Sequence, residues 1–386
     1  MNEAVMRAGS SGDRGVASLL AGAAGDWIHA PKWDLSILIG SALVVPLVLF
    51  VVWAGVPNLA LNITVTALIG GPHVFSTYLA TYADPAFRRS HGWLLLLSAL
   101  LIPAAVIYAT LNHFQILLSF FIFAASIHVL QQNAYLTDIY RARKGVREMR
   151  FARLIDYGLL SICIYPIAAY KLVHADFKLG DTQILIPDLF MTPATYYVVW
   201  AVFGFFLLAW LGKTAIEWRS GMLNVPKTIL IAATTVIAFF IPAAASGERL
   251  ELAFQAVNTW HSLQYLGIIW YVQKVRKEMG LIESPAIRKI SGGGKATWYF
   301  YGTCFAITAV LFGLLLGLYA VDPLNLPFMR YFYMGLLSVL LIHYFLDGWF
   351  FAVSNRKGVK IEDIPFAAPA AYRPTGREAA AAAAAA

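Results

Sequence analysis

Ten apolar runs of about 20 residues constrain this chain more than any other feature. A bilayer core about 30 Å thick is crossed by about 20 apolar residues in helical form. The predicted spans lie at roughly 35–55, 59–82, 93–111, 114–138, 154–172, 195–213, 227–246, 250–272, 298–320 and 331–353. Only 13% of the 386 residues are charged, whereas a soluble domain carries about 25%. The composition therefore excludes a soluble globular enzyme, a disordered protein and a nucleic-acid-binding domain.

The distribution of Lys and Arg predicts how the spans are oriented. If the N-terminus is cytoplasmic, 25 of the 29 basic residues fall in cytoplasmic segments. The other four are Lys171, Lys178, Arg249 and Arg330. Cytoplasmic loops of membrane proteins carry an excess of Lys and Arg, so the pattern favours ten spans with both termini cytoplasmic. The net charge of +8 is then a consequence of topology, and we expect no nucleic-acid partner.

The predicted fold class is an all-α polytopic bundle of about ten transmembrane helices. A cytoplasmic or interfacial segment, 1–33, precedes the membrane domain 34–353, and a cytoplasmic tail, 354–386, follows it. No cleavable signal peptide is visible at the N-terminus, and we expect the protein in a bacterial inner membrane. The two cysteines lie in apolar runs and form neither a CxxC motif nor a disulfide framework.

Four histidines lie deep within the predicted spans and at nearly the same depth. His73, His128, His261 and His343 occupy the second, fourth, eighth and tenth spans, which all run from the outside to the cytoplasm. The next basic residue at the cytoplasmic edge follows His73 by 15 residues and each of the others by 13. At about 1.5 Å per helical residue the spread in depth is about 3 Å. Ionisable residues inside a membrane are costly and usually functional, so this plane is a candidate site.

A histidine tetrad in an apolar bundle suits iron, zinc or copper better than magnesium or calcium, which prefer oxygen ligands. Gln132 follows His128 by four residues and Asp347 follows His343 by four, so each shares the face of its histidine. Asp347 is predicted either to ligate the metal or to orient a ligand imidazole.

Further candidate site residues surround the third and fourth histidine helices. Asn258 and Gln264 lie three residues on either side of His261, where their amides could orient ligands or bind a polar part of a substrate. Tyr265 and Phe345 are aromatic residues close to the depth of the site and are predicted to line an apolar substrate pocket.

The histidine pattern resembles the Brp/Blh family of membrane β-carotene dioxygenases. The resemblance rests on His73 in Gly-Gly-Pro-His, His128 in Ser-Ile-His-Val and His261 in Asn-Thr-Trp-His-Ser. It implies a polytopic helical protein in which histidines from separate helices hold one iron. The chain departs from that pattern in having no histidine pair at i, i+4. It also lacks the HxxxH and HxxHH boxes of membrane desaturases and hydroxylases.

The preferred interpretation is a membrane metalloenzyme with a four-histidine non-haem Fe(II) site. It would use O₂ to oxidise or cleave an isoprenoid, carotenoid or acyl chain that enters between helices from the lipid. The expected partners are membrane lipids and this lipophilic small molecule, and any redox partner is unknown. One alternative is a b-type haem oxidoreductase or electron carrier with two of the histidines as axial ligands. Another is a metal-ion transporter, with which the helix break at Gly70-Gly71-Pro72 is compatible.

Overall fold

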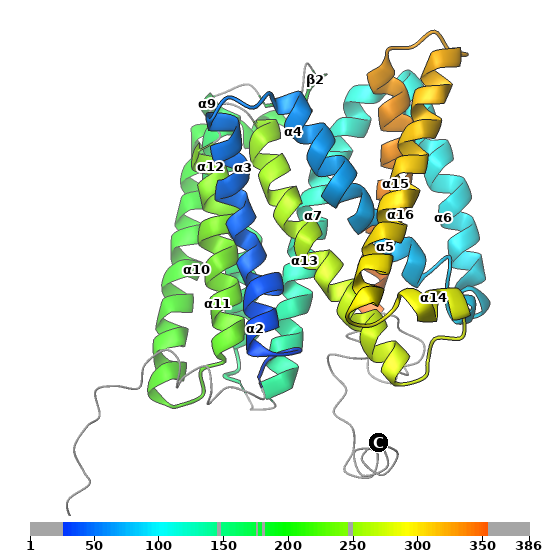
Figure 1. Ribbon diagram of the computed structural model, residues 1–386. Coiled ribbons are helices and arrows are strands. Elements are labelled where there is room, and N and C mark those ends of the chain that lie inside the picture. The colour runs from blue at the N-terminus through cyan, green and yellow to red at the C-terminus, as the bar shows by residue number, and fades with distance from the viewer. Residues whose placement is uncertain (1–25, 145–147, 175–176, 180–181, 246–249, 354–386) are drawn as a thin grey trace, which may run out of the picture.

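The computed structural model describes residues 26–144, 148–174, 177–179, 182–245 and 250–353, and it is a bundle of helices (Figure 1). The elements are α2 (Pro31–Trp33), η1 (Asp34–Ile39), η2 (Gly40–Leu43), α3 (Val44–Trp53), α4 (Asn58–Val65), η3 (Thr66–Gly70), α5 (Gly71–Ala80), α6 (Pro85–Asn112), α7 (Phe114–Lys144), α8 (Ala152–Ile162), α9 (Tyr165–His174), β1 (Lys178–Leu179), β2 (Thr182–Gln183), η4 (Asp188–Phe190), α10 (Pro193–Arg219), α11 (Val225–Ala233), η5 (Thr234–Phe240), α12 (Ile241–Ala245), α13 (Leu250–Glu278), α14 (Pro285–Ile290), α15 (Lys295–Val321) and α16 (Phe328–Val353). The two short strands pair antiparallel. The predicted all-α bundle is thereby confirmed. The predicted terminal segments lie outside the described residues, except for 26–33.

Eight of the helices in the described ranges are long and apolar enough to cross a membrane. They match eight of the ten predicted spans. The predicted span 154–172 is instead two short helices, α8 and α9, which meet at residues 163–164. The predicted span 250–272 lies within the single 29-residue helix α13, which carries many polar side chains. The total of ten spans and the sidedness of the termini remain predictions.

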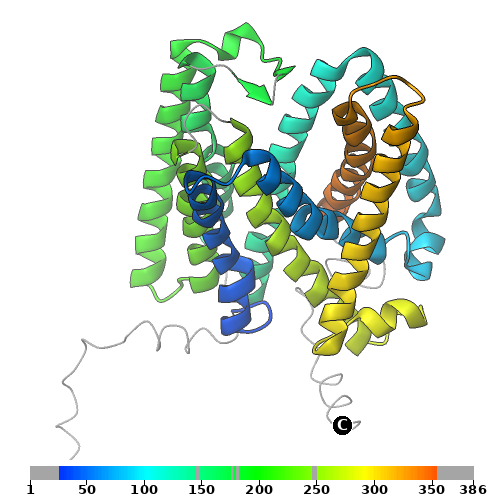
Figure 2. The same cartoon turned by 45° about the horizontal axis from the view of Figure 1, so that its top comes forward.

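Two helices, α7 and α13, run through the middle of the molecule. On one side of them lie α3, α10, α11 and α12, and on the other lie α6, α15 and α16 (Figures 1 and 2). Helix α13 packs against α3, α5, α7 and α12, while α16 packs against α5, α6 and α7. The basic C-terminal ends of α7, α10 and α13 lie at the same end of the bundle (Figure 1). Through these contacts α5, α7, α13 and α16 join the two halves of the bundle. The site described below lies at this junction.

Irregular turns interrupt three of the membrane-length helices next to a proline. The turns η1–η2, η3 and η5 each precede a proline by a few residues, namely Pro46, Pro72 and Pro242. Proline lacks an N–H and leaves the carbonyl four residues earlier without its helical partner. For Pro72 that carbonyl belongs to Leu68, and it accepts a hydrogen bond of 2.7 Å from the Tyr301 hydroxyl of α15. A neighbouring helix thus satisfies the break, as the absence of water in a bilayer requires.

The same break brings α5 and α15 into close contact. A Cβ atom added to Gly71 would lie 2.1 Å from Cγ2 of Thr308 on α15. Only glycine fits this approach without moving one of the helices. The Gly-Gly-Pro sequence therefore both loosens the helix that carries His73 and fixes its distance from α15.

A buried network of ion pairs joins α7, α8, α10 and α11. Asp156 is fully buried, and its carboxylate oxygens lie 2.8 Å from Nζ of Lys213, 3.1 Å from Nζ of Lys227 and 2.9 Å from a guanidinium nitrogen of Arg141. Arg141, Lys213 and Lys227 are among the basic residues whose positions in the sequence predict the sidedness of the membrane helices. In the fold they also hold four helices together.

Replacing Asp156 with alanine is expected to destabilise the fold by about 3–5 kcal/mol, because it leaves buried cations without their counter-charge. Denaturation of the purified protein in mixed detergent micelles, followed by tryptophan fluorescence, measures the change. The matched control is Glu278→Ala, which breaks a pair with Lys274 in which the Glu278 side chain is 57% exposed. That variant should lose less than about 1 kcal/mol. Equal losses in the two variants would show that the network is not what holds these helices.

Candidate metal centre

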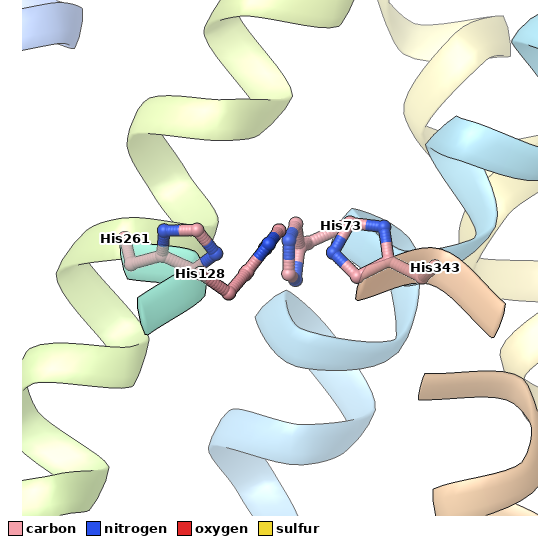
Figure 3. A group of neighbouring side chains, drawn as sticks. All are labelled: His73, His128, His261 and His343. Carbon is pink, nitrogen blue, oxygen red and sulfur yellow. The ribbon is translucent and has the colours of Figure 1, made fainter. Parts of the chain in front are cut away.

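The four deep histidines meet in the middle of the bundle. They come from α5, α7, α13 and α16, and one ring nitrogen from each lies within 4.8 Å of one from every other (Figure 3). All four side chains are at most 2% exposed. The spacing of each histidine from the next basic residue predicts one shared depth in the membrane. In the fold the four histidines form one cluster.

The imidazole rings form a closed ring of four neighbours. In order around it, His73, His261, His128 and His343 have centroid separations of 4.9, 4.7 and 4.9 Å, and His343 returns to His73 at 4.4 Å. Each adjacent pair is close to perpendicular, with interplanar angles between 73° and 89°. His261 and His128 lie on one side of the cluster in Figure 3, and His73 and His343 on the other.

Six ring nitrogens of the cluster have no hydrogen-bond partner among the described residues. These are Nε2 of His73, Nε2 of His343 and both nitrogens of His128 and His261. A buried polar atom without a partner is costly, and such groups are rare in folded proteins. Because a neutral imidazole offers one lone pair, a cation bound by all four rings would account for four of these six atoms, one from each ring. Four nitrogens bound at about 2.0–2.1 Å to one ion lie up to about 4.2 Å apart, close to the spacing seen here. The residues therefore fit a metal ion.

Two of the histidines are held by hydroxyl groups on their outer nitrogens. Oγ of Ser262 lies 3.1 Å from Nδ1 of His73, and Oγ1 of Thr77 lies 2.7 Å from Nδ1 of His343. In metal sites the ring nitrogen that does not ligate usually donates to such a partner, which fixes the tautomer and the ring orientation. In both cases Nε2 is left for the metal.

Asp347 lies beside the cluster and organises these contacts. Its Oδ1 accepts hydrogen bonds from the Tyr265 hydroxyl at 2.6 Å and from the Thr77 hydroxyl at 3.3 Å. Because Thr77 donates to the carboxylate, its oxygen is free to accept the Nδ1–H of His343. Oδ2 of Asp347 has no hydrogen-bond partner in the described part of the chain, and it lies 3.6 Å from Nδ1 of His343 and 3.8 Å from Nε2 of His128.

The three predicted amides take different places. Gln132 donates from Nε2 to Oε1 of Gln264 at 2.6 Å and to the backbone oxygen of His261 at 3.3 Å. Gln264 in turn donates to the backbone oxygen of Leu38 at 2.6 Å. The hydrogen bonds of these two amides thus connect α7, α13 and η1, about one turn after the histidines of α7 and α13. Asn258 lies apart from them, in the wall of a cavity.

The two aromatic residues predicted to line a substrate pocket do not share a surface. Tyr265 is fully buried and bonded to Asp347, and its ring lies edge-on to His73 at 4.8 Å. Phe345 is 44% exposed on the outer face of α16. Neither lines the cavity that contains Asn258.

Sequence reasoning does not identify Thr77 and Ser262. Thr77 follows His73 by four residues, the same spacing that singles out Gln132 and Asp347. Its partner, however, is His343 on another helix, which spacing within one helix cannot reveal. Ser262 adjoins His261 in the sequence, yet it contacts His73.

Replacing Thr77 with valine is expected to weaken metal binding about tenfold, because His343 loses the acceptor that orients its ring. Competitive chelator titration of the purified protein measures the affinity. Thr81→Val is the matched control, since the Thr81 hydroxyl donates to a backbone oxygen one turn away, that of Thr77. Unchanged affinity in Thr77→Val would contradict an orienting role.

No family model, curated protein or solved structure matches this chain. The resemblance to the β-carotene dioxygenases therefore rests on the histidine motifs alone, and the functional argument rests on the site.

Proposed function

We propose that this protein is an integral membrane metalloenzyme that holds non-haem iron on His73, His128, His261 and His343. The observation that carries the proposal is the cluster of buried ring nitrogens, which lack hydrogen-bond partners among the residues that the structure describes, inside a bundle of membrane-length helices. Iron bound by histidines with open coordination positions supplies O₂-dependent oxidation. The expected substrate is lipophilic, an isoprenoid, carotenoid or acyl chain, because the site is enclosed by apolar helices.

The spacing of the rings supports a single ion rather than a haem. Neighbouring imidazoles are 4.4–4.9 Å apart, and a porphyrin between any two of them would occupy the space of the other two. The burial of all four rings supports a dry site. The buried carboxylate of Asp347, 3.8 Å from Nε2 of His128, would offset part of the charge of a buried cation.

The residues of the chain have separate tasks in this proposal. The four histidines bind the ion, while Thr77 and Ser262 orient two of them through Nδ1. Asp347 and Tyr265 form hydrogen bonds with the Thr77 hydroxyl. These bonds hold its oxygen where it accepts the Nδ1–H of His343. Oxidative cleavage of a carbon–carbon double bond by one O₂ places one oxygen atom on each carbon. It gives two carbonyl products and consumes no reductant, so this variant needs no redox partner.

The test is aerobic incubation of the iron-loaded protein in lipid nanodiscs with a conjugated isoprenoid and with an unsaturated fatty acid. The proposal expects O₂ consumption together with carbonyl products that carry ¹⁸O from ¹⁸O₂. The His261→Gln variant, which should lack iron, serves as the control and should form neither. Product formation that is equal in the variant, or O₂ uptake with no labelled product, would contradict the proposal.

A further inference from the structure

An apolar cavity of about 390 Å³ adjoins the histidine cluster. It lies between α7, α9, α10, α12 and α13, and its volume falls within the range of about 300–1,000 Å³ of small-molecule sites. Val129 adjoins His128 on α7, and Asn258 precedes His261 by three residues on α13, and both line the cavity. One end of the cavity is therefore within a helical turn of two of the four histidines.

From this end the cavity runs toward one end of the bundle. Its wall follows α7 back from Val129 to Ile122, a distance of about 10 Å along the helix. Phe177, Pro187 and Phe190, all from the segment between α9 and α10, complete the other end. This segment, which contains β2, lies at the end of the bundle opposite the basic C-terminal ends of α7, α10 and α13 (Figure 1). The cavity thus extends along the helices from the level of the histidines to one rim of the membrane domain.

The lining of the cavity is almost entirely hydrocarbon. The hydroxyls of Ser126 and Thr195 each donate to a backbone oxygen at 3.0 Å. Lys171 and Asn258 border the cavity toward its two ends, and no acidic side chain is among the described residues of the lining. A polar headgroup buried between these ends would lose its hydration without gaining partners, which is costly. The cavity therefore suits a hydrocarbon chain whose headgroup stays outside it.

The cavity also opens on the outer face of the bundle. Phe123 of α7 and Phe190 of η4 both line it, and they are 45% and 48% exposed. In a membrane these side chains contact lipid, so a chain can enter sideways without crossing water.

The direction of the cavity matches that of a lipid chain in a bilayer. The hydrocarbon core is about 30 Å thick, so each leaflet supplies about half of it, and an acyl chain runs from its headgroup at the interface to its methyl end near the midplane. His128 lies near the middle of the 31-residue helix α7, which places the histidine cluster close to that midplane. A lipid with its headgroup at the rim thus brings the far end of its chain to the cluster.

We infer that the cavity binds one acyl chain of an intact membrane glycerolipid, with the headgroup at the rim formed by the segment between α9 and α10 and the far end of the chain beside His128 and His261. The inference deepens the proposed function, on which its catalytic meaning rests, by naming the class of substrate. The wall includes Ala125 of α7 and Ala253 of α13. A large side chain at either position would fill the space that the chain occupies.

The experiment places the purified full-length protein in nanodiscs with phosphatidylcholine whose sn-2 chain carries a diazirine, either at the methyl end or next to the ester. After irradiation, mass spectrometry maps the crosslinked peptides. The methyl-end probe should label the stretches of α7 and α13 that line the cavity near the histidines, and the probe next to the ester should label the segment between α9 and α10 instead. Ala125→Phe and Ala253→Phe should each remove the methyl-end label from the cavity. The control is Ala105→Phe, at an exposed position of α6, and it should change nothing.

Three results in the labelling pattern would overturn the inference. They are methyl-end label spread evenly over the lipid-exposed helices, equal labelling of the cavity by the two probes, or cavity labelling that persists in both phenylalanine variants. Displacement of the methyl-end probe by a small amount of squalene would also overturn it, because the cavity would then select a free isoprenoid hydrocarbon over a lipid chain.

The same labelling of His128→Gln separates the two proposals, because the cavity should still be labelled when the metal is lost. Absence of iron from the wild-type protein would defeat the proposed function. Absence of cavity labelling in a protein that holds iron would defeat only this inference.

Discussion

Replacing any one of the four clustered histidines with alanine is expected to reduce bound iron from about one per protein to background. Each ring supplies one of the four nitrogens that lie within 4.8 Å of one another, and no acid or cysteine joins this group among the described residues. A cation that loses one of four ligands in an apolar core gains no water in exchange, because the cluster is buried. Metal content after affinity purification, measured by elemental analysis, gives the result.

Two controls keep this prediction open to refutation. His113→Ala alters an exposed histidine that follows α6 and should leave the iron content unchanged. Histidine-to-glutamine variants at the four positions preserve most of the side-chain volume, and size-exclusion chromatography shows whether they remain folded. If iron persists at full occupancy in all four folded variants, the cluster is not the metal site.

Asp347→Asn is expected to weaken metal binding by up to about 100-fold, less than the loss of a histidine. The asparagine keeps an oxygen to accept from Tyr265 and Thr77, but it removes the negative charge beside the cation. Chelator competition measures the change, and the Thr77→Val variant provides the scale for the loss of orientation alone.

The outcome for Asp347 decides between its two predicted roles. Its Oδ1 accepts two hydrogen bonds, and its Oδ2 lies 3.8 Å from Nε2 of His128, which favours an orienting carboxylate. A loss of iron in Asp347→Asn equal to that in the histidine variants would instead make Asp347 a ligand.

The histidine cluster could be predicted because membrane depth is readable from the sequence. The number of residues from each histidine to the next basic residue at the helix end gives its depth, and four nearly equal depths on helices of one direction predict a meeting point. The hydroxyls of Thr77 and Ser262 could not be found in the same way. Each bonds to a histidine of a different helix, and that choice depends on how the helices rotate against one another.

Two other features of the structure could not be predicted from the hydropathy or the spacing of residues in the sequence. The apolar run 154–172 contains no break that hydropathy detects, yet α8 and α9 are separate helices. Its spacing to His261 predicts that Asn258 is a site residue, and the structure places Asn258 in the wall of a cavity formed by five helices, which that spacing does not reveal. A cavity is the space left by packing, and no single helix encodes it.

X-ray absorption at the metal edge of the purified wild-type protein shows directly whether the four histidines bind iron. We expect iron surrounded by about four imidazole nitrogens at about 2.0–2.1 Å, with no porphyrin pattern and no intense Soret band in the visible spectrum of the same sample. A protein that holds no transition metal after reconstitution, or one whose metal has a porphyrin or an oxygen-only environment, would contradict it.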